Sequence, residues 1–331
     1  MAESTRRILL KQMAALGLAS IAGGEPPSFA SQIPDQVEQD HSEFFSGFRR
    51  FKTNTSGAII NAVVGGSGPG LLLLHGYPQT HIMWRKIAAQ LAEHFTVVIP
   101  DLRGYGDSSK PDAGEGHSGY SKRAMALDQV ELMGSLGFKK FAVVGHDRGG
   151  RVAHRMALDH SGIVERVAVL DIVPTYKLYH SVTKEFAIAY FHFFFLIQPA
   201  PFPETLIGNN VEFYLRNWIF QRARPGVIDE QAFAEYFRCY HNPATIHASC
   251  EDYRAAASID LEHDAADLNR KISCPLLVLW AEQGTMQSLF NVLDTWRERA
   301  LSVMGKAIPG GHYLPEENPQ IVLQELTAFL R

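Results

Sequence analysis

The sequence has few cysteines and almost no excess of charge, and each shortage excludes a class of protein. The 331 residues include three cysteines without a CxxC pair, so the spacing indicates neither a disulfide framework nor a zinc site. A Cys239–Cys250 bond stays open, although buried thiols agree better with an odd count. The net charge of −4 gives a nucleic acid no basic surface to bind. Internal repeats and low-complexity tracts are also lacking.

The sequence also lacks an apolar run that could cross a bilayer, but its first residues look like an export signal. Arg6 and Arg7 precede the apolar run 13–22, which is shorter than the roughly 20 residues that a membrane helix needs. A Gly/Pro/Ser/Ala-rich segment follows. Paired arginines before a short apolar run are typical of a twin-arginine signal, so we expect residues 1–31 to be removed. The protein would then be periplasmic or secreted. An amphipathic helix with two incidental arginines is the alternative.

What the sequence does contain is a large apolar core with alternating strand and helix patterns. Hydrophobic residues make up 46% of the chain and charged residues 20%, which is typical of a globular protein. The alternation predicts a mostly parallel, doubly wound sheet after a linker at 32–44. Strands are expected at 48–52 and 58–64, as a hairpin of edge strands, and at 71–74, 95–99, 141–144, 164–170, 276–280 and 301–308; helices are expected at 84–93, 120–136 and 150–160.

Residues 174–264 interrupt this alternation. They are rich in aromatic residues and mostly helical in pattern, and we interpret them as a lid over the carboxyl ends of the strands. The lid would separate a first core segment, 45–173, from a second core segment, 265–331.

The stretch 141–155 carries the most informative pattern. A short buried strand is followed by Asp147, which has Gly145 and Gly149 two positions away on either side, and then by an amphipathic run. This is the spacing of a nucleophile elbow, in which small neighbours let a strand and a helix approach a strained residue. A carboxylate at that position attacks an electrophilic carbon and forms an ester, which water must then break. A glycine-rich turn with a solvated aspartate is the alternative.

A backbone oxyanion hole is predicted beside this elbow. Tyr77 follows a His-Gly pair at the end of the strand 71–74, and sheets of this kind bind ligands at such strand ends. Its N–H and the N–H of Arg148 can donate to an oxygen that acquires negative charge. A simple turn that terminates the strand is the alternative for residues 75–78.

The other catalytic candidates follow later strands. His312 lies on a glycine loop after the last predicted strand and is the candidate base. Asp171 follows the strand 164–170 and is the candidate residue that orients this histidine. Glu282, which follows the strand 276–280, competes with it for the orienting role. This set implies no metal and no organic cofactor.

Two arginines close to Asp147 suggest the charge of the substrate. Arg148 and Arg151 lie one and four positions beyond it, so both can face one pocket. Two guanidinium groups can hold a carboxylate bidentately and keep Asp147 ionised. They would hold a substrate carboxylate so that an electrophilic carbon faces the Asp147 carboxylate. Structural salt bridges are the alternative for both arginines.

Taken together, the motifs resemble the α/β-hydrolase superfamily and, within it, the fluoroacetate and haloacetate dehalogenases. The resemblance covers roughly residues 45–331. It is carried by the segments HGYPQTHIMW (75–84), DLRGYGDSSKP (101–111), GHDRGGRVAHRMALDH (145–160), DIVPTY (171–176), YFHFFFLIQPAPFPE (190–204), CEDYRAAASIDLEHD (250–264) and PGGHYLPEENP (309–319).

This resemblance implies a hydrolytic dehalogenase that converts small 2-haloacids, such as haloacetates, to 2-hydroxyacids through an ester of Asp147. It places the orienting acid at Asp171 and is compatible with a homodimer. The expected partner is a small-molecule substrate. Neither a nucleic acid nor a stable membrane anchor after removal of the leader is expected.

One position departs from the resembled family. The lid of those dehalogenases supplies halide-binding donors from a His-Trp pair and a tyrosine; His192 matches the histidine and Tyr253 is taken as the tyrosine, but Phe193 occupies the tryptophan position. A phenyl ring cannot donate a hydrogen bond to halide, and fluoride needs such donors most. Losing one donor to developing charge typically costs about 10² to 10³ in rate. We therefore expect chloro and bromo substrates to be favoured over fluoro substrates. Ordinary packing inside the lid is the alternative for the aromatic cluster 190–195.

Two rival functions stay open. An epoxide hydrolase shares the elbow aspartate but needs lid tyrosines to protonate the epoxide oxygen. The candidates are Tyr176, Tyr179, Tyr190, Tyr214 and Tyr253. A neutral epoxide has no use for two arginines, which counts against this rival. An exported binding module that has lost turnover is the second rival, and the intact set of nucleophile, base and orienting acid argues against it.

Overall fold

The structure is a computed structural model, and it describes residues 38–39 and 44–331. The predicted export signal (1–31) and most of the predicted linker lie outside the described residues. In the described part, one sheet has the strand order β1-β2-β3-β5-β4-β6-β7-β8-β9. Its strands are β1 (Glu38–Gln39), β2 (Arg49–Asn54), β3 (Ile59–Gly65), β4 (Gly70–Leu74), β5 (Thr96–Pro100), β6 (Phe141–His146), β7 (Val164–Leu170), β8 (Leu276–Ala281) and β9 (Val303–Ile308).

The sheet is mostly parallel, as the alternation predicts. Strands β4 to β9 pair in parallel, and β1, β2 and β3 join antiparallel. The predicted hairpin is present, because β2 pairs with β3 from Arg49↔Val64 to Asn54↔Ile59. The prediction that both hairpin strands lie at the sheet edge is wrong, because β1 pairs with the first two residues of β2 and β3 is paired on both sides. Its second half, from Ala62, pairs with β5 on the other side, so β3 is an internal strand.

The helices outside the lid follow the predicted alternation with shifted ends. They are η2 (His81–Trp84), α2 (Ala88–Ala92), η3 (Glu115–Tyr120), α3 (Lys122–Ser135), α4 (Arg148–Asp159), α13 (Thr285–Leu289), α14 (Val292–Arg297), α15 (Leu314–Glu317) and α16 (Pro319–Leu330). α4 begins two residues before its predicted start, because the chain leaves β6 through a single turn residue, Asp147. The carbonyl of Asp147 already accepts from the N–H of Arg151 (3.1 Å).

The helix predicted at 84–93 is wrong in its first half. The N–H groups of Arg85 and Ile87 each bond to a carbonyl three residues back (3.0 Å), so this stretch forms 3-10 turns and the α-helix starts only at Ala88. A long-range contact fixes the stretch, since the Arg85 guanidinium pairs with Glu316 at 2.6 Å. Local periodicity contains no information about that contact.

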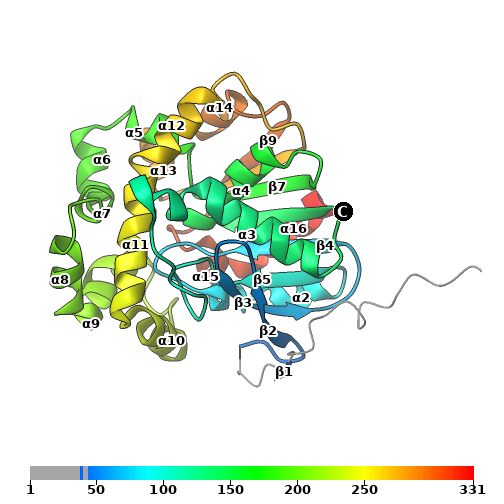
Figure 1. Cartoon of the computed structure of the whole chain (residues 1–331). Helices are drawn as coiled ribbons and strands as arrows, with labels where there is room; N and C mark the ends of the chain where they lie inside the picture. Colours follow the sequence, from blue (N-terminus) through cyan, green and yellow to red (C-terminus); the bar gives the residue numbers. More distant parts are fainter. Residues whose placement is uncertain (1–37, 40–43) are drawn as a thin grey trace, which may run out of the picture. The chain divides into compact units, whose positions relative to one another are not determined.

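The helices cover both faces of the sheet. α3 packs against α4, and α4 packs against β4, β6 and β7, while α16 packs against α2. In Figure 1, α3 and α4 lie in front of the strands and α16 lies behind them. The central strands are therefore buried on both faces, and Leu71 to Leu74 of β4 are fully buried. Among the described residues, no helix combines the length and the apolar character required to cross a bilayer.

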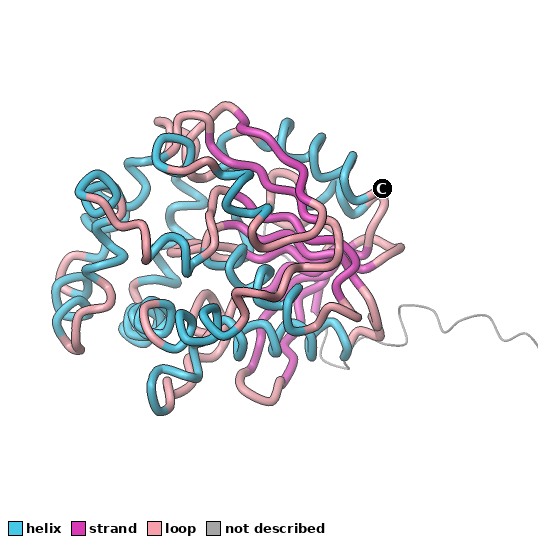
Figure 2. Tube along the Cα trace, turned by 90° about the horizontal axis from the view of Figure 1, so that it is seen from above, coloured by secondary structure: helices cyan, strands magenta, loops and turns pink. Residues whose placement is uncertain are grey.

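The chain between β7 and β8 forms a separate group of helices. They are α5 (Thr175–Tyr179), α6 (Lys184–Ala189), α7 (Phe191–Phe195), α8 (Phe202–Gly208), α9 (Val211–Tyr214), η4 (Leu215–Ile219), η5 (Phe220–Arg222), α10 (Glu230–Tyr240), α11 (Pro243–Ala256) and α12 (Ile259–Ala266). Most of this group lies to the left of the sheet in Figure 1, and Figure 2 shows helices beyond one end of the strands. We keep the word lid for residues 174–264.

Gly149 offers a test of how tightly β4, β6 and α4 are packed. A Cβ atom at this position would lie 2.4 Å from the carbonyl oxygen of His75, so the backbone would have to move. We expect Gly149→Ala to lower the free energy of unfolding by about 1 to 3 kcal/mol, measured by urea denaturation.

The matched control is Gly134→Ala, on the exposed side of α3, where a Cβ atom would meet nothing within 4 Å. This change should stabilise the protein by up to about 1 kcal/mol, because alanine favours a helix. If Gly149→Ala were as stable as the wild type, the close approach of Gly149 to the carbonyl of His75 would be contradicted.

Candidate active site

The turn after β6 holds Asp147 in a strained conformation. Its φ is 45° and its ψ is −116°, a region that non-glycine residues rarely occupy. The neighbouring glycines make the turn sterically feasible. A Cβ atom on Gly145 would lie 2.3 Å from the carbonyl oxygen of Gly149, and one on Gly76 would lie 2.6 Å from the Cβ atom of Asp147. The predicted elbow geometry is therefore present, with a carboxylate at its apex.

The Asp147 carboxylate is buried but favours its charged form. Burial by itself raises its pKa, but the charges of His312, His146 and Arg148 outweigh this effect and lower the pKa below its usual value. The N–H of Tyr77 donates to Oδ2 of Asp147 at 3.2 Å. One predicted oxyanion donor therefore already contacts the carboxylate oxygen.

The second predicted oxyanion donor is the N–H of Arg148. As the first residue of α4, Arg148 has no helical carbonyl four residues back for its N–H. This leaves the group available to an oxygen at the start of the helix.

His312 and Asp171 lie together, as the loop positions predict. Nδ1 of His312 lies 2.6 Å from Oδ2 of Asp171, and Oδ1 of Asp171 accepts from the N–H of Ala281 at 2.9 Å. Burial lowers the pKa of His312, but the hydrogen bond and the charge of Asp171 outweigh it, so the pKa is raised above 6.5. The rival acid, Glu282, is exposed, and no bond between its side chain and His312 is found in the described structure.

The two arginines next to the elbow differ from each other. Arg148 is fully buried and donates to Asp252 from Nε (2.9 Å) and Nη2 (2.7 Å), so it does form the structural salt bridge that was the alternative. Arg151 instead donates from Nη1 to the carbonyl of Val173 (3.1 Å) and to the hydroxyl of Thr175 (2.9 Å). Nη1 of Arg148 and Nε of Arg151 are buried without a partner. Each guanidinium therefore retains a free donor for a carboxylate.

A small cavity joins most of the candidate residues. It is narrow and is lined by Tyr77, Asp147, Tyr190, His192, Ile219, Arg222, His312 and Tyr313. Arg148, Arg151 and Tyr253 do not line it and lie behind its wall. The Arg148 guanidinium stacks on the Tyr253 ring, 4.1 Å from the ring centre, and the Arg151 guanidinium lies 5.6 Å from the centre of the Phe193 ring.

The predicted halide-binding side chains have free polar atoms. Nδ1 of His192 and the hydroxyl of Tyr253 are buried without a hydrogen-bond partner. Burial strongly lowers the pKa of His192, with the charge of Arg222 as the next cause, so the ring is neutral in neutral solution. Phe193 is buried and packs edge-on against Tyr253, with ring centres 5.2 Å apart. The phenyl ring thus adds apolar packing where the family's tryptophan would add a donor.

Sequence analysis missed Asp252, which connects the lid to the core. This carboxylate on α11 is fully buried and binds Arg148, the ammonium group of Lys122 and the hydroxyl of Tyr105 (2.7 Å). Burial raises its pKa, but the charges of Arg148 and Lys122 outweigh burial and lower it. Asp252 lies in a segment that carries the family resemblance, but its partners are more than 100 residues away in the chain.

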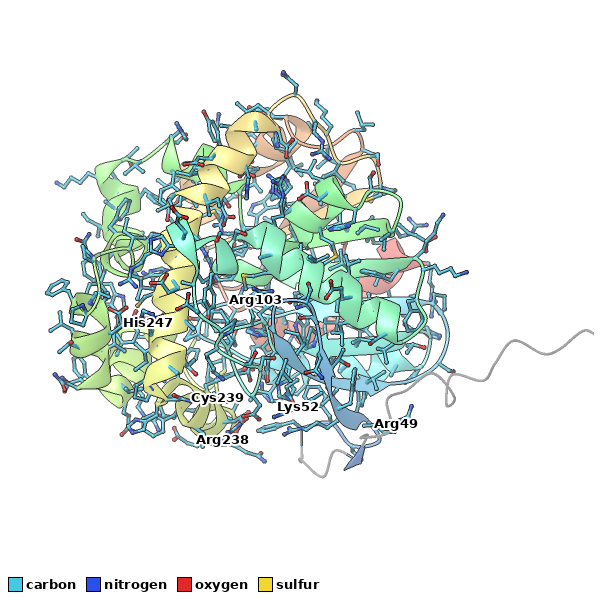
Figure 3. The ribbon with its side chains drawn as sticks, in the orientation of Figure 1. Arg49, Lys52, Arg103, Arg238, Cys239 and His247 are labelled. Atoms are coloured by element: carbon cyan, nitrogen blue, oxygen red, sulfur yellow. The ribbon has the colours of Figure 1, made fainter. Side chains whose placement is uncertain are left out.

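The loop that carries Tyr105 is itself held by an arginine. Nε and Nη2 of Arg103 donate to the carboxylate of Asp128 on α3 at 2.5 and 2.6 Å. In the view of Figure 3, Arg103 lies between α11 and the strands of the sheet. The loop therefore supports the contact between the lid and Arg148.

The described residues form no metal-ligand cluster and no disulfide. Among the described residues, no group of three or more His, Cys, Asp or Glu side chains is arranged to hold a metal ion. The three cysteines are free thiols; Cys239 and Cys250 are buried and Cys274 is half-buried.

Comparison with known proteins places this geometry in a family. The family model described as alpha/beta hydrolase fold matches residues 69–319. The chain belongs to the alpha/beta hydrolase family. With a fluoroacetate dehalogenase from Burkholderia sp it shares 47% identity, over 86% of this chain and 95% of that protein. With a soluble epoxide hydrolase from Corynebacterium sp. (strain C12) it shares 37% identity, over 83% and 94%.

A solved structure gives the same result for this α/β hydrolase. A candidate alpha/beta hydrolase from Nostoc sp PCC 7120 superposes with a TM-score of 0.84 at 57% identity, over 86% of this chain and 98% of that one. The predicted fold class is confirmed, and the protein is a hydrolase of this superfamily.

Asp252 provides a test of the contact between the lid and the core. Asp252→Asn would leave the buried cation Arg148 without its countercharge, while Lys122 would keep only Asp260, at 3.5 Å. We expect the free energy of unfolding to fall by about 3 to 5 kcal/mol, measured by urea denaturation, because an unpaired buried charge is strongly destabilising.

The control is Asp294→Asn, which breaks the pair Asp294–Arg297, where both side chains are more than half exposed. It should change stability by less than about 1 kcal/mol. Similar losses of stability in the two variants would show that Asp252 is not an essential countercharge between the lid and the core.

Proposed function

We propose that this α/β hydrolase is a hydrolytic dehalogenase of small 2-haloacids such as haloacetates. The observation that carries the proposal is the small cavity in which a charged Asp147 lies close to His312, with unused donors of Arg148 and Arg151 behind its wall. Such a site suits a small anion with an electrophilic carbon. The similarity to a fluoroacetate dehalogenase at 47% identity supports the same substrate class.

In the first step, the free donors of Arg148 and Arg151 bind the substrate carboxylate once the side chains that separate them from the cavity have moved aside. Asp147 then attacks the α-carbon in line with the carbon–halogen bond. The new C–O bond forms as the halogen leaves with the bonding electrons, which gives halide and an ester of Asp147. The nucleophilic oxygen in this scheme is Oδ1, because Oδ2 accepts the N–H of Tyr77.

In the second step, His312 takes a proton from water, and the resulting hydroxide attacks the ester carbonyl of Asp147. The negative charge develops on Oδ2, where the N–H of Tyr77 already donates and the N–H of Arg148 is available. Collapse of this intermediate breaks the bond between the carbonyl carbon and Oδ1, which leaves as the hydroxyl oxygen of the 2-hydroxyacid. The product takes up the proton of the added hydroxyl group, which restores the carboxylate, and His312 releases its proton to solvent. Asp171 orients the imidazole and stabilises its protonated form.

His192 and Tyr253 would donate to the departing halide, since each has a buried polar atom without a partner. Phe193 provides no third donor. Fluoride, which leaves poorly and concentrates its charge, should therefore be released more slowly than chloride or bromide.

The test is halide release from chloroacetate and fluoroacetate by the wild type, Asp147→Asn and Phe193→Trp. We expect chloride release by the wild type, none by Asp147→Asn, and weak fluoride release. Phe193→Trp should raise fluoride release by up to about 10²-fold with little change for chloride, because it restores an indole donor.

Phe195→Trp is the size control, because Phe195 packs on Phe191 and Phe202, whereas Phe193 packs on His192 and Tyr253. It should leave the ratio of fluoride to chloride release unchanged. Brisk fluoride release by the wild type would contradict the role assigned to Phe193. Release of neither halide would refute the haloacid proposal.

An epoxide hydrolase is the second candidate function. The free hydroxyl of Tyr253 and the position of Tyr190 in the cavity wall favour it, since a lid tyrosine must protonate the epoxide oxygen. The similarity to a soluble epoxide hydrolase at 37% identity points the same way. Turnover of styrene oxide without halide release from chloroacetate would replace the first proposal by this one.

The raised pKa of His312 gives a pH dependence that separates the two steps. His312 acts as a base only when deprotonated, so ester hydrolysis should slow about tenfold per pH unit below its pKa. The displacement step needs only ionised Asp147, whose pKa is lowered, and so should continue in mild acid.

We therefore expect a burst of one halide per active site at mildly acid pH and steady turnover at alkaline pH, measured by rapid-quench kinetics. Asp171→Asn should shift the inflection to lower pH, since the bond to Asp171 raises the pKa of His312. If Asp171→Asn and the wild type had the same pH profile, the pairing of Asp171 with His312 would be contradicted.

Two properties of the whole chain are also part of the proposal. The paired Arg6 and Arg7 before a short apolar run support twin-arginine export, and hence a periplasmic or secreted enzyme. The family resemblance supports a homodimer.

A further inference from the structure

The active-site cavity contains an arginine that the reaction scheme does not use. Arg222 ends η5 in the lid and lines the cavity with Asp147. It also lines a second, outer pocket, which includes Ile188 on α6 and Gly284 beyond β8. Among the lining residues, Tyr190, Arg222 and His312 are common to both spaces. These three side chains therefore form the wall between the outer pocket and the cavity.

The outer pocket is the larger of the two spaces and reaches the surface. Its room for small molecules is far greater than that of the cavity. Ile188 in its wall is 65% exposed. A small molecule that passes from this pocket to Asp147 must therefore pass Arg222.

The bonding of Arg222 differs from that of the arginines beside the elbow. Its Nη2 donates to the carbonyl of Ala189, and the guanidinium lies over the rings of Tyr190 (5.5 Å) and Trp218 (5.9 Å). Within residues 44–331, no carboxylate forms an ion pair with it, whereas Arg148 is paired with Asp252. A half-buried cation without a counter-ion, held between two rings, is ready to bind an anion.

The charge of Arg222 acts inside the cavity. After burial, it is the largest cause that lowers the pKa of His192, and it also opposes the raised pKa of His312. The loop that carries His312 packs closely on η5, because a Cβ atom on Gly311 would lie 3.1 Å from the carbonyl oxygen of Arg222. The backbone of Arg222 thus lies against the loop of the catalytic histidine.

We propose that Arg222 is the first receptor for the substrate carboxylate, which it draws from the outer pocket past Tyr190 and His312 towards Arg148 and Arg151. This inference rests on the proposed haloacid substrate and extends it to selection at the entrance. The cation raises the local concentration of small carboxylates and gives neutral molecules no such advantage. Electrostatic attraction of this kind raises association rates by about 10- to 10³-fold and weakens with added salt.

The experiment compares Arg222→Gln, Arg222→Lys and the wild type in chloroacetate turnover at low and high ionic strength. For Arg222→Gln we expect a loss of about tenfold in kcat/KM at low salt, almost entirely through KM, and a much weaker salt dependence. Arg222→Lys should recover most of the loss, because it keeps the charge.

The matched control is Arg216→Gln in the same lid segment. Arg216 pairs at the surface with Glu212 and Glu230 and does not line the cavity. It should leave KM and the salt dependence unchanged. Wild-type KM and salt dependence in Arg222→Gln would overturn the inference. A loss confined to kcat that lysine does not rescue would also overturn it, because that pattern indicates a structural role.

Binding of glycolate, a small 2-hydroxyacid, separates this inference from the proposed function. Isothermal calorimetry reports it whether or not the enzyme releases halide. About tenfold weaker binding to Arg222→Gln than to the wild type, with binding recovered in Arg222→Lys, supports the anion receptor even if chloroacetate is not turned over. Equal glycolate affinity in the wild type and Arg222→Gln overturns the receptor, while halide release by the wild type would still support the dehalogenase.

Discussion

The close approach of β4, β6 and α4 at the elbow is the constraint on which the active site depends. Gly145 and Gly149 leave no room for a Cβ atom, and Asp147 between them is held at a positive φ. The strain is sustained because the central strands on either side are buried and paired over their length. As a result the carboxylate is fixed, and the N–H of Tyr77 is already directed at one of its oxygens.

The distribution of charge around this elbow follows from where counter-ions are placed. Asp252 compensates Arg148 and Lys122, which makes two buried cations tolerable and connects the lid to the core. Arg151 has only uncharged partners, and Arg222 stacks on aromatic rings. The site therefore keeps cationic groups that can serve an anionic substrate while Asp147 stays ionised. A neutral substrate would leave those cations uncompensated, so the charge distribution supports the proposed haloacid over an epoxide.

The lid decides what the shared catalytic set can act on. Asp147, His312 and Asp171 fit either a dehalogenase or an epoxide hydrolase, since both form an ester and hydrolyse it. In the proposed reaction, the side chains that would contact the leaving group come from the lid, where His192 and Tyr253 have free polar atoms and Phe193 has none. Substrate selection within this fold is therefore a matter of a few lid donors and cations, which a family assignment does not specify.

The sequence by itself determined the order of strands and helices, the elbow and its aspartate, and the loops that carry His312 and Asp171. These features are local: an apolar run, a glycine spacing and a residue that follows a strand. Only the tertiary structure showed that β3 is internal, that 3-10 turns replace the first half of the helix predicted at 84–93, and that Asp252 and Arg222 belong to the site. Each of these depends on contacts between distant segments, such as Arg148 with Asp252, 104 positions apart. No local period or spacing encodes such a contact, because it exists only once the chain has packed.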